Sequence, residues 1–289
     1  MMHVSLMVVA IATAILLRLV LTHKCLQQAH GLAVLSLLVV SPLLLLTTAV
    51  AIIIMGPHGQ MVSPVEGWVS YNTAWLFVIT SGGLLVHLGW QAYQSMAQIK
   101  QYPQQQLSHG TIVRMMDADT AFSAQIGLWA PELVISQGLL DTLDQEHLAA
   151  VIAHEQAHYY YRDTFWFFWL GWLRRLSLWL PYTDELWQEL LLLREIRADN
   201  WATRSVDRLT LAESLVQVIA APLAPVALAN FSCTAPSSRL SRRIDALLAE
   251  EHDPDHDYGF QPRWSLTTTG CMVGLGLGLF PLCSIPFHY

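Results

Sequence analysis

Two histidines and a glutamate carry the clearest chemical signal in the sequence. His154 and His158 are four residues apart, and Glu155 directly follows the first of them. On a helix, residues four apart point to the same side, so both imidazoles can bind one metal ion. Glu155 can then act as general base toward a water molecule, and zinc is the usual metal in such sites. The pattern predicts a zinc-dependent peptidase, although it is only moderately specific by itself.

A second charged segment supplies a candidate for the third metal ligand. Glu195 and Asp199 lie on a later predicted helix, again four residues apart. Two histidines and one glutamate leave a coordination position open for water, as in catalytic rather than structural zinc sites. Asp199 would then hydrogen-bond a ligand imidazole and orient it. The alternative is an ordinary solvated helix face, held by ion pairs with Arg194 and Arg197.

Long apolar segments at the two ends of the chain predict a membrane protein. The sequence is 54% hydrophobic and only 13% charged, whereas soluble domains contain about 25% charged residues. Four segments approach the roughly 20 residues that a bilayer requires: Val4–Leu21, Leu32–Ile54, Thr73–Tyr93 and Trp264–Ile285. The first is also compatible with a signal peptide, but no small-x-small cleavage site follows it.

The basic residues set the expected orientation. Arg18 and Lys24 lie at the first connection, none lies between Met55 and Asn72, and the others all fall between Met96 and Arg263. With four crossings, every basic residue is on one side of the membrane, which the positive-inside rule makes cytoplasmic. Both termini are then outside.

These patterns predict three regions. Residues 1–95 should form a three-span membrane region, residues 96–263 a cytoplasmic zinc metalloprotease domain, and residues 264–289 a fourth span with a short outside tail. We therefore expect a mainly α membrane protein with a zincin-like α+β domain between spans three and four. Its net charge of −7 argues against direct nucleic-acid binding, which needs a basic face.

Within the middle region, strand-like runs precede several helices. The runs are Thr111–Met116, Ala121–Gln125 and Glu132–Ser136, after a polar linker from Gln94 to His109. Helices are expected from Asp144, the predicted N-cap, to about Tyr159–Asp163, over Asp184–Arg204 and over Arg239–Glu251. An extended substrate should add to the sheet edge near Leu133–Ser136. Ala221–Ser238 reads as an exposed loop in which the protease could cut itself.

The segment Phe165–Trp172 is almost wholly aromatic, and the basic pair Arg174 and Arg175 follows it. Tryptophan is favoured at membrane interfaces, so we expect this stretch to lie at the cytoplasmic leaflet of the bilayer or to dip into it. A fifth full span is the alternative, but it would be short and would contain the basic pair.

Several segments together resemble the BlaR/MecR-type antirepressor metalloproteases. They are Ala121–Ala124, Gly127–Ser136, Leu148–His158 and Tyr161–Asp163, and the order of the spans is also similar. The resemblance implies that His154, His158 and Glu195 hold zinc, that Glu155 is the catalytic base and that Asp199 supports the site. It also implies that an outside signal activates the protease in the bacterial cytoplasmic membrane. The expected substrate is a cytoplasmic winged-helix, BlaI-like repressor.

One feature differs from the β-lactam sensors of that family. The sequence ends at Tyr289, shortly after the fourth expected span, so we do not expect a penicillin-binding sensor domain. Met55, His58 and Met61 lie in an expected outside loop, and thioether and imidazole groups suit soft metal ions. A soft-metal signal is therefore one hypothesis, while ordinary contact of these side chains with lipid is the simpler alternative.

Two other functions remain open at this level. An HtpX-like quality-control protease would share the zinc chemistry and need no dedicated signal. A metal-binding membrane sensor without peptidase activity would keep the ligands alone. The sequence leaves open whether the chain forms a homodimer.

Overall fold

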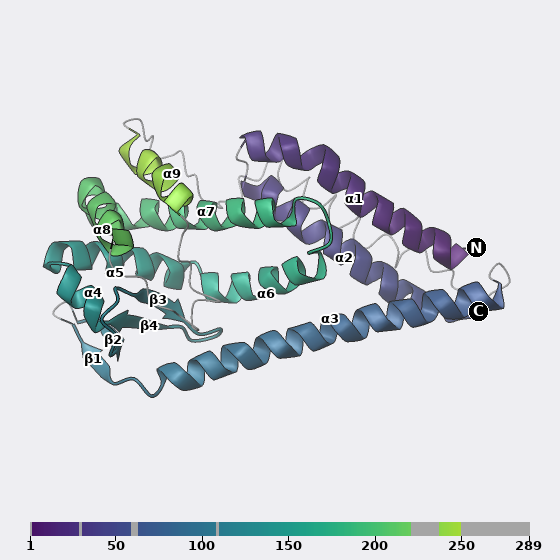
Figure 1. Ribbon diagram of the computed structural model, residues 1–289, viewed down its shortest axis with the longest axis horizontal. Helices are drawn as coiled ribbons and strands as arrows, with labels where there is room; N and C mark the ends of the chain where they lie inside the picture. Colours follow the sequence, from purple (N-terminus) through teal and green to yellow (C-terminus); the bar gives the residue numbers. More distant parts are fainter. Residues whose placement is uncertain (1, 29–30, 59–62, 108–109, 221–236, 250–289) are drawn as a thin grey trace. The chain divides into compact units, whose positions relative to one another are not determined.

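The computed structural model describes residues 2–28, 31–58, 63–107, 110–220 and 237–249 of the chain (Figure 1). These residues fall into two compact units. Among the described residues, one contains those within Met1–Leu88 and Leu170–Leu190, and the other contains those within Gly89–Trp169 and Leu191–Gly259. We call them the membrane unit and the catalytic unit.

The membrane unit is built from three long apolar helices, α1 (Met2–Gln28), α2 (Gly31–Met55) and α3 (Pro64–Ile99). Each is long and apolar enough to cross a membrane. This confirms the first three predicted spans, and the fourth, Trp264–Ile285, lies outside the described residues. The helix α3 extends beyond the prediction at both ends, so the expected polar linker begins with helical residues.

A helical hairpin formed by α6 (Asp163–Leu176) and α7 (Thr183–Ala202) has its turn within the membrane unit. Leu180, in this turn, is buried in a cluster with Ala10 and Ala14 of α1 and Leu44 and Leu45 of α2. The aromatic segment is therefore not a fifth full span, because α6 has only 14 residues and a span needs about 20.

Hydrogen bonding also ties the hairpin to a span. Trp172 Nε1 on α6 donates to the backbone oxygen of Ser81 on α3 over 3.0 Å. An indole N–H that is removed from water needs such an acceptor. The end of α6 thus packs within the membrane unit, and the sequence predicted that the aromatic segment lies at or dips into the cytoplasmic leaflet.

A small mixed sheet forms one layer of the catalytic unit. Its strands are β1 (Gln104–Gln106), β2 (Ile112–Met116), β3 (Ser123–Ile126) and β4 (Glu132–Ser136), in the order β1-β2-β4-β3. The strands β2 and β4 are parallel, and the other pairs are antiparallel. The three predicted strands are present, but β4 is bonded on both sides. The expectation that substrate adds to a sheet edge near Leu133–Ser136 is therefore wrong, because the edge strands are β1 and β3.

Helices pack against one face of this sheet. The helix α5 (Gln145–Tyr160) places Val151 and Ile152 in a core with Val113, Leu133 and Ile135, which point from alternate positions of β2 and β4, and with Leu139 of α4 (Gln137–Thr142). Asp144 is the N-cap of α5, as predicted, and its side chain accepts from the backbone N–H groups of Glu146 and His147. Such a cap fixes the point at which the helix begins.

Two further helices cover the other side of α5. They are α8 (Arg208–Ala220), which the sequence analysis missed, and α9 (Ser237–Leu248), which corresponds to the predicted amphipathic helix. Leu211 and Leu215 of α8 and Leu247 of α9 share a core with the small residues Ala150, Ala153 and Ala202. Because alanine side chains are short, the helices can approach closely there. The expected self-cleavage loop falls almost wholly outside the described residues.

Candidate active site

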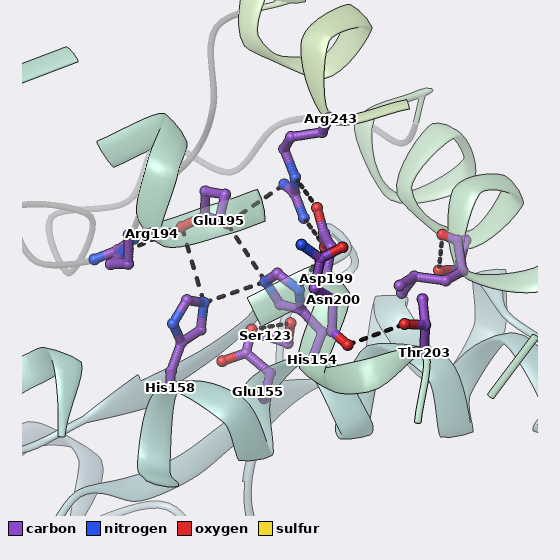
Figure 2. Close-up of polar contacts among 12 residues, drawn as sticks. Ser123, His154, Glu155, His158, Arg194, Glu195, Asp199, Asn200, Thr203 and Arg243 are labelled. Carbon is purple, nitrogen blue, oxygen red and sulfur yellow. Dashed lines mark hydrogen bonds and ion pairs between the residues drawn. The ribbon is translucent and has the colours of Figure 1, made fainter. Parts of the chain in front are cut away.

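The structure brings together the three residues that the sequence predicted as metal ligands (Figure 2). His154 Nε2 lies 3.2 Å from His158 Nε2 and 3.4 Å from Glu195 Oε2, and His158 Nε2 lies 3.8 Å from Glu195 Oε1. Zinc–ligand bonds of about 2.0–2.2 Å would place tetrahedral ligand atoms roughly 3.4 Å apart. The three side chains therefore fit a zinc ion, and all three are buried.

The ligands come from two helices of the catalytic unit. His154 and His158 lie one turn apart on the buried side of α5, while Glu195 is presented by α7 (Figure 2). Burial of a glutamate and two histidines without partners would be costly. Here each side chain has partners, so the cluster is a built site rather than a solvated helix face.

Each histidine meets a carboxylate through its second ring nitrogen. His154 Nδ1 lies 2.8 Å from Asp199 Oδ1, and His158 Nδ1 lies 2.7 Å from Asp163 Oδ2. A carboxylate at Nδ1 keeps the proton there and leaves Nε2 free to bind a metal. Both Nε2 atoms point into the cluster, so the rings have the orientation that zinc needs.

The role of Asp163 was missed in the sequence. It is the first residue of α6, five residues after His158, and it also pairs with Arg197 of α7. The available signal was the segment Tyr161–Asp163, directly after the histidine motif. Spacing alone could not show that the chain turns back after α5 and aims this carboxylate at His158.

Arginines surround the acidic ligand. Arg194 Nη2 donates to Glu195 Oε1 over 2.6 Å, and Arg243 Nη1 lies 3.4 Å from Glu195 Oε2. Burial by itself would raise the pKa of Glu195, but these positive charges and the histidines hold it well below its usual range. Glu195 is therefore ionised at neutral pH, as a metal ligand must be.

The same balance of burial and charge applies to the supporting carboxylates. Burial would raise the pKa of Asp199, yet the Arg243 guanidinium lowers it below its usual value. Burial likewise opposes ionisation of Asp163, while His158 and Arg197 lower its pKa. Burial lowers the pKa of His154, but contact with Asp199 outweighs it and raises that pKa to about 9. The site is thus organised to hold positive charge at its centre.

Glu155 lies beside the three ligands rather than among them. Its side chain is buried, and Ser123 Oγ donates to Glu155 Oε1 over 2.9 Å. Ser123 is the first residue of the edge strand β3. The carboxylate is therefore held between the candidate metal site and β3, which is one of the two edge strands of the sheet.

A cavity of about 310 Å³ lies on the face of the sheet that α5 covers. Its lining includes Gln125 of β3, Leu133 of β4, and Gln156 and Tyr159 of α5. Gln125 Oε1 is buried and has no hydrogen-bond partner. The cavity thus has both polar and apolar walls and lies next to the helix that carries Glu155.

Two of the three proposed outside metal ligands have other neighbours in the structure. Met55 packs against an apolar cluster that contains Ile52 and Ala74, and the ring of His58 lies edge-on to Trp68 at 5.6 Å. Met61 lies outside the described residues. The contacts of Met55 and His58 lend no support to a soft-metal site.

Comparison with known proteins identifies the chemistry. Residues 91–182 match the model of Peptidase family M48. The protein is a zinc metallopeptidase. The matched segment contains the sheet, α5 with His154, Glu155 and His158, and the whole of α6. Glu195 follows the matched segment and completes the cluster of three ligands.

The comparisons with curated proteins and with solved structures give no match. The family match and the metal cluster therefore carry the assignment together. With three helices that can cross a bilayer, the peptidase is a multi-pass membrane protein.

Proposed function

We propose that this membrane zinc peptidase relays an outside signal by cutting a cytoplasmic transcriptional repressor. The observation that carries the peptidase part is the buried cluster of His154, His158 and Glu195 with Glu155 beside it. The BlaR/MecR resemblance, which is finer than the family match, supports the repressor as substrate. The basic residues support a protease domain on the cytoplasmic side of the bacterial inner membrane.

The side chains divide the work of peptide hydrolysis. A zinc ion bound to the three ligands would polarise the scissile carbonyl and make water more acidic. Glu155 takes the proton from the attacking water and passes it to the leaving amine. Ser123 donates to one oxygen of that carboxylate and limits its rotation. Asp163 and Asp199 keep the two imidazoles in place.

The sheet edge provides a place for the substrate backbone. An extended segment of the substrate would pair with β3, whose other side is bonded to β4, as in strand-addition complexes. Its side chains would alternate in direction, and one of them could enter the cavity between Leu133 and Tyr159. This arrangement favours a flexible or partly unfolded region of the target protein.

Two continuous helices provide a route from the membrane to the zinc site. The helix α6 begins at Asp163, the partner of His158, and its residues from Leu170 on belong to the membrane unit. The helix α7 begins in the membrane unit and carries Glu195 and Asp199 in the catalytic unit. A change in span packing around the hairpin turn can therefore move a ligand and a ligand's partner together. The nature of the signal stays a hypothesis, and replacing Met55, His58 and Met61 together tests the soft-metal version.

The rival function is membrane protein quality control by an HtpX-like protease. The same zinc chemistry would then act on many unfolded substrates rather than on one regulator. The two proposals predict different products from a folded, DNA-binding target. A non-catalytic sensor is disfavoured because Glu155 is held at the site by Ser123.

The test uses the full chain in lipid vesicles, as wild type and as Glu155→Gln. Each is offered a folded winged-helix repressor encoded beside the protease gene and, separately, an unfolded membrane-protein fragment. Signalling predicts one discrete cut in the repressor by wild type and none by Glu155→Gln. Many cuts in the fragment with an intact repressor would contradict signalling and favour quality control.

A further inference from the structure

The C-terminal helix of the catalytic unit supplies an arginine to the centre of the zinc site. Arg243 lies on α9, 48 residues after Glu195 in the sequence, and only 4% of it is exposed. Figure 2 shows its guanidinium above Glu195 and Asp199. The neighbouring Arg242, on the same helix, is exposed. One arginine of this basic pair is therefore directed inward.

The contacts of Arg243 join two carboxylates with different tasks. Its Nε and Nη2 donate to the two oxygens of Asp199 over 2.8 and 2.7 Å, in a two-pronged arrangement. Its Nη1 lies 3.4 Å from Oε2 of Glu195. Asp199 in turn lies 2.8 Å from His154 Nδ1. A single guanidinium thus reaches a metal ligand directly and a second ligand through its supporting carboxylate.

We propose that Arg243 is a positioning residue of the zinc site, and that docking of α9 completes that site. The inference rests on the zinc-peptidase assignment and extends the site beyond α5 and α7. Planar arginine matches the geometry of a carboxylate, so it fixes the Asp199 plane as well as its charge. Asp199 then holds His154 in the orientation that aims Nε2 at the metal.

Arg243 also offsets the repulsion between two buried carboxylates. Glu195 and Asp199 lie one turn apart on α7, and both are buried. Two like charges at this spacing repel each other, and the repulsion is stronger away from water. Arg243 lies against both and allows them to stay ionised and parallel. Without it, the two side chains would turn apart, and the ligand oxygen of Glu195 would leave its place.

Apolar packing explains how α9 can deliver this side chain. Leu247 of α9 is buried against Ala150 and Ala153 of α5, and Leu240 packs partly buried against the same cluster. These contacts hold α9 against the turn of α5 that contains Ala150 and Ala153, next to His154. The helix thus brings a charged group to the site while its own apolar side holds it there.

The experiment compares full-length wild type with Arg243→Gln, Arg243→Lys and the matched control Arg242→Gln, all in detergent or nanodiscs. Zinc affinity is measured by chelator competition, and the metal geometry by the visible spectrum of the cobalt-substituted protein. The thermal midpoint of the metal-free protein is recorded for each variant. Cleavage of an unfolded protein substrate gives kcat and KM.

We expect Arg243→Gln to bind zinc 10- to 100-fold more weakly, as is usual when a supporting partner of a ligand is lost. Its cobalt spectrum should change, and kcat should fall while KM stays within about twofold. Arg243→Lys should recover part of the loss, because it restores the charge but not the two-pronged contact. Arg242→Gln should match wild type.

Two results would overturn the inference. One is a folded Arg243→Gln with wild-type zinc affinity and cobalt spectrum. If that variant does not fold, Arg243→Lys decides, and wild-type affinity, spectrum and kcat in this variant would show that the arginine geometry is irrelevant. A wild type that binds no zinc would instead overturn the peptidase assignment on which the inference depends.

Discussion

Replacement of Asp163 by asparagine tests the support of His158 with almost no change in shape. The two carboxylate oxygens of Asp163 have separate partners, His158 Nδ1 at 2.7 Å and the guanidinium of Arg197. Asparagine keeps one acceptor oxygen and turns an N–H₂ group toward the other donor. One buried hydrogen bond is therefore lost and two donors face each other.

The size of the effect follows from that loss. A buried donor left without its partner costs about 1–3 kcal/mol, and loss of a supporting carboxylate typically weakens metal binding or activity about 10- to 100-fold. The free-energy cost and the fold-change agree, since about 1.4 kcal/mol corresponds to a factor of 10 in an equilibrium constant. We expect Asp163→Asn to bind zinc 10- to 100-fold more weakly than wild type.

Chelator competition on the full chain measures this affinity, with the thermal midpoint of the metal-free protein as a check on folding. Asp117→Asn is the control, because Asp117 is exposed and lies on the connection after β2. A folded Asp163→Asn protein with zinc affinity within twofold of wild type would refute the role of this carboxylate.

Three further predictions follow from other contacts. Ser123→Ala should lower kcat about 10-fold by freeing Glu155, with unchanged zinc content; unchanged kcat would show that the contact at 2.9 Å has no role in the reaction. Asp144→Ala removes the N-cap of α5 and should cost about 1 kcal/mol of stability, which thermal unfolding measures against the exposed control Asp141→Ala. Hydrogen bonds that His147 donates to Asp144 and Glu213 raise its pKa, and burial opposes them. That stabilisation is complete below the ordinary histidine pKa of about 6.5 and is lost as pH rises through the raised folded value. The thermal midpoint of wild type should therefore fall relative to His147→Gln between pH 6 and pH 8.5, and parallel profiles would contradict it.

The sequence was most informative where a local pattern determines the result. The spacing of His154 and His158 predicts a shared helix face, and Asp144 marks the beginning of that helix, because both depend only on neighbouring residues. The three spans were equally visible, since burial in lipid requires long apolar runs. The segment of α8 was missed, because its apolar residues follow a short turn without a strong break before it.

Features that depend on tertiary contacts could not be read in this way. The strand order places β4 between β2 and β3, and nothing in the segment Glu132–Ser136 distinguishes an inner strand from an edge. Asp163 reaches the site because the chain turns back after α5. Arg243 reaches it because α9 packs against α5. Charged residues in such positions look like ordinary surface residues until the chain is folded.

The packing of the α6–α7 hairpin also could not be predicted from the sequence. The basic pair Arg174 and Arg175 and the acidic start of α7 argue for a surface location, yet Leu180 is buried with residues of α1 and α2. Arg174 pairs with Asp184 over 2.7 Å, so the two charges near the turn offset each other. A hydropathy pattern counts both charged residues and does not show that they pair with each other.

The central question for this protein is whether it hydrolyses peptide bonds with a zinc ion held by His154, His158 and Glu195. The decisive measurement is the rate at which the purified full chain cuts an unfolded protein substrate, for wild type and Glu155→Gln loaded with equal zinc. We predict about one zinc per chain in both proteins, and cleavage by wild type that falls at least 100-fold in Glu155→Gln. Equal cleavage by the two proteins would contradict the role of Glu155, and absence of bound zinc from wild type would contradict the account as a whole.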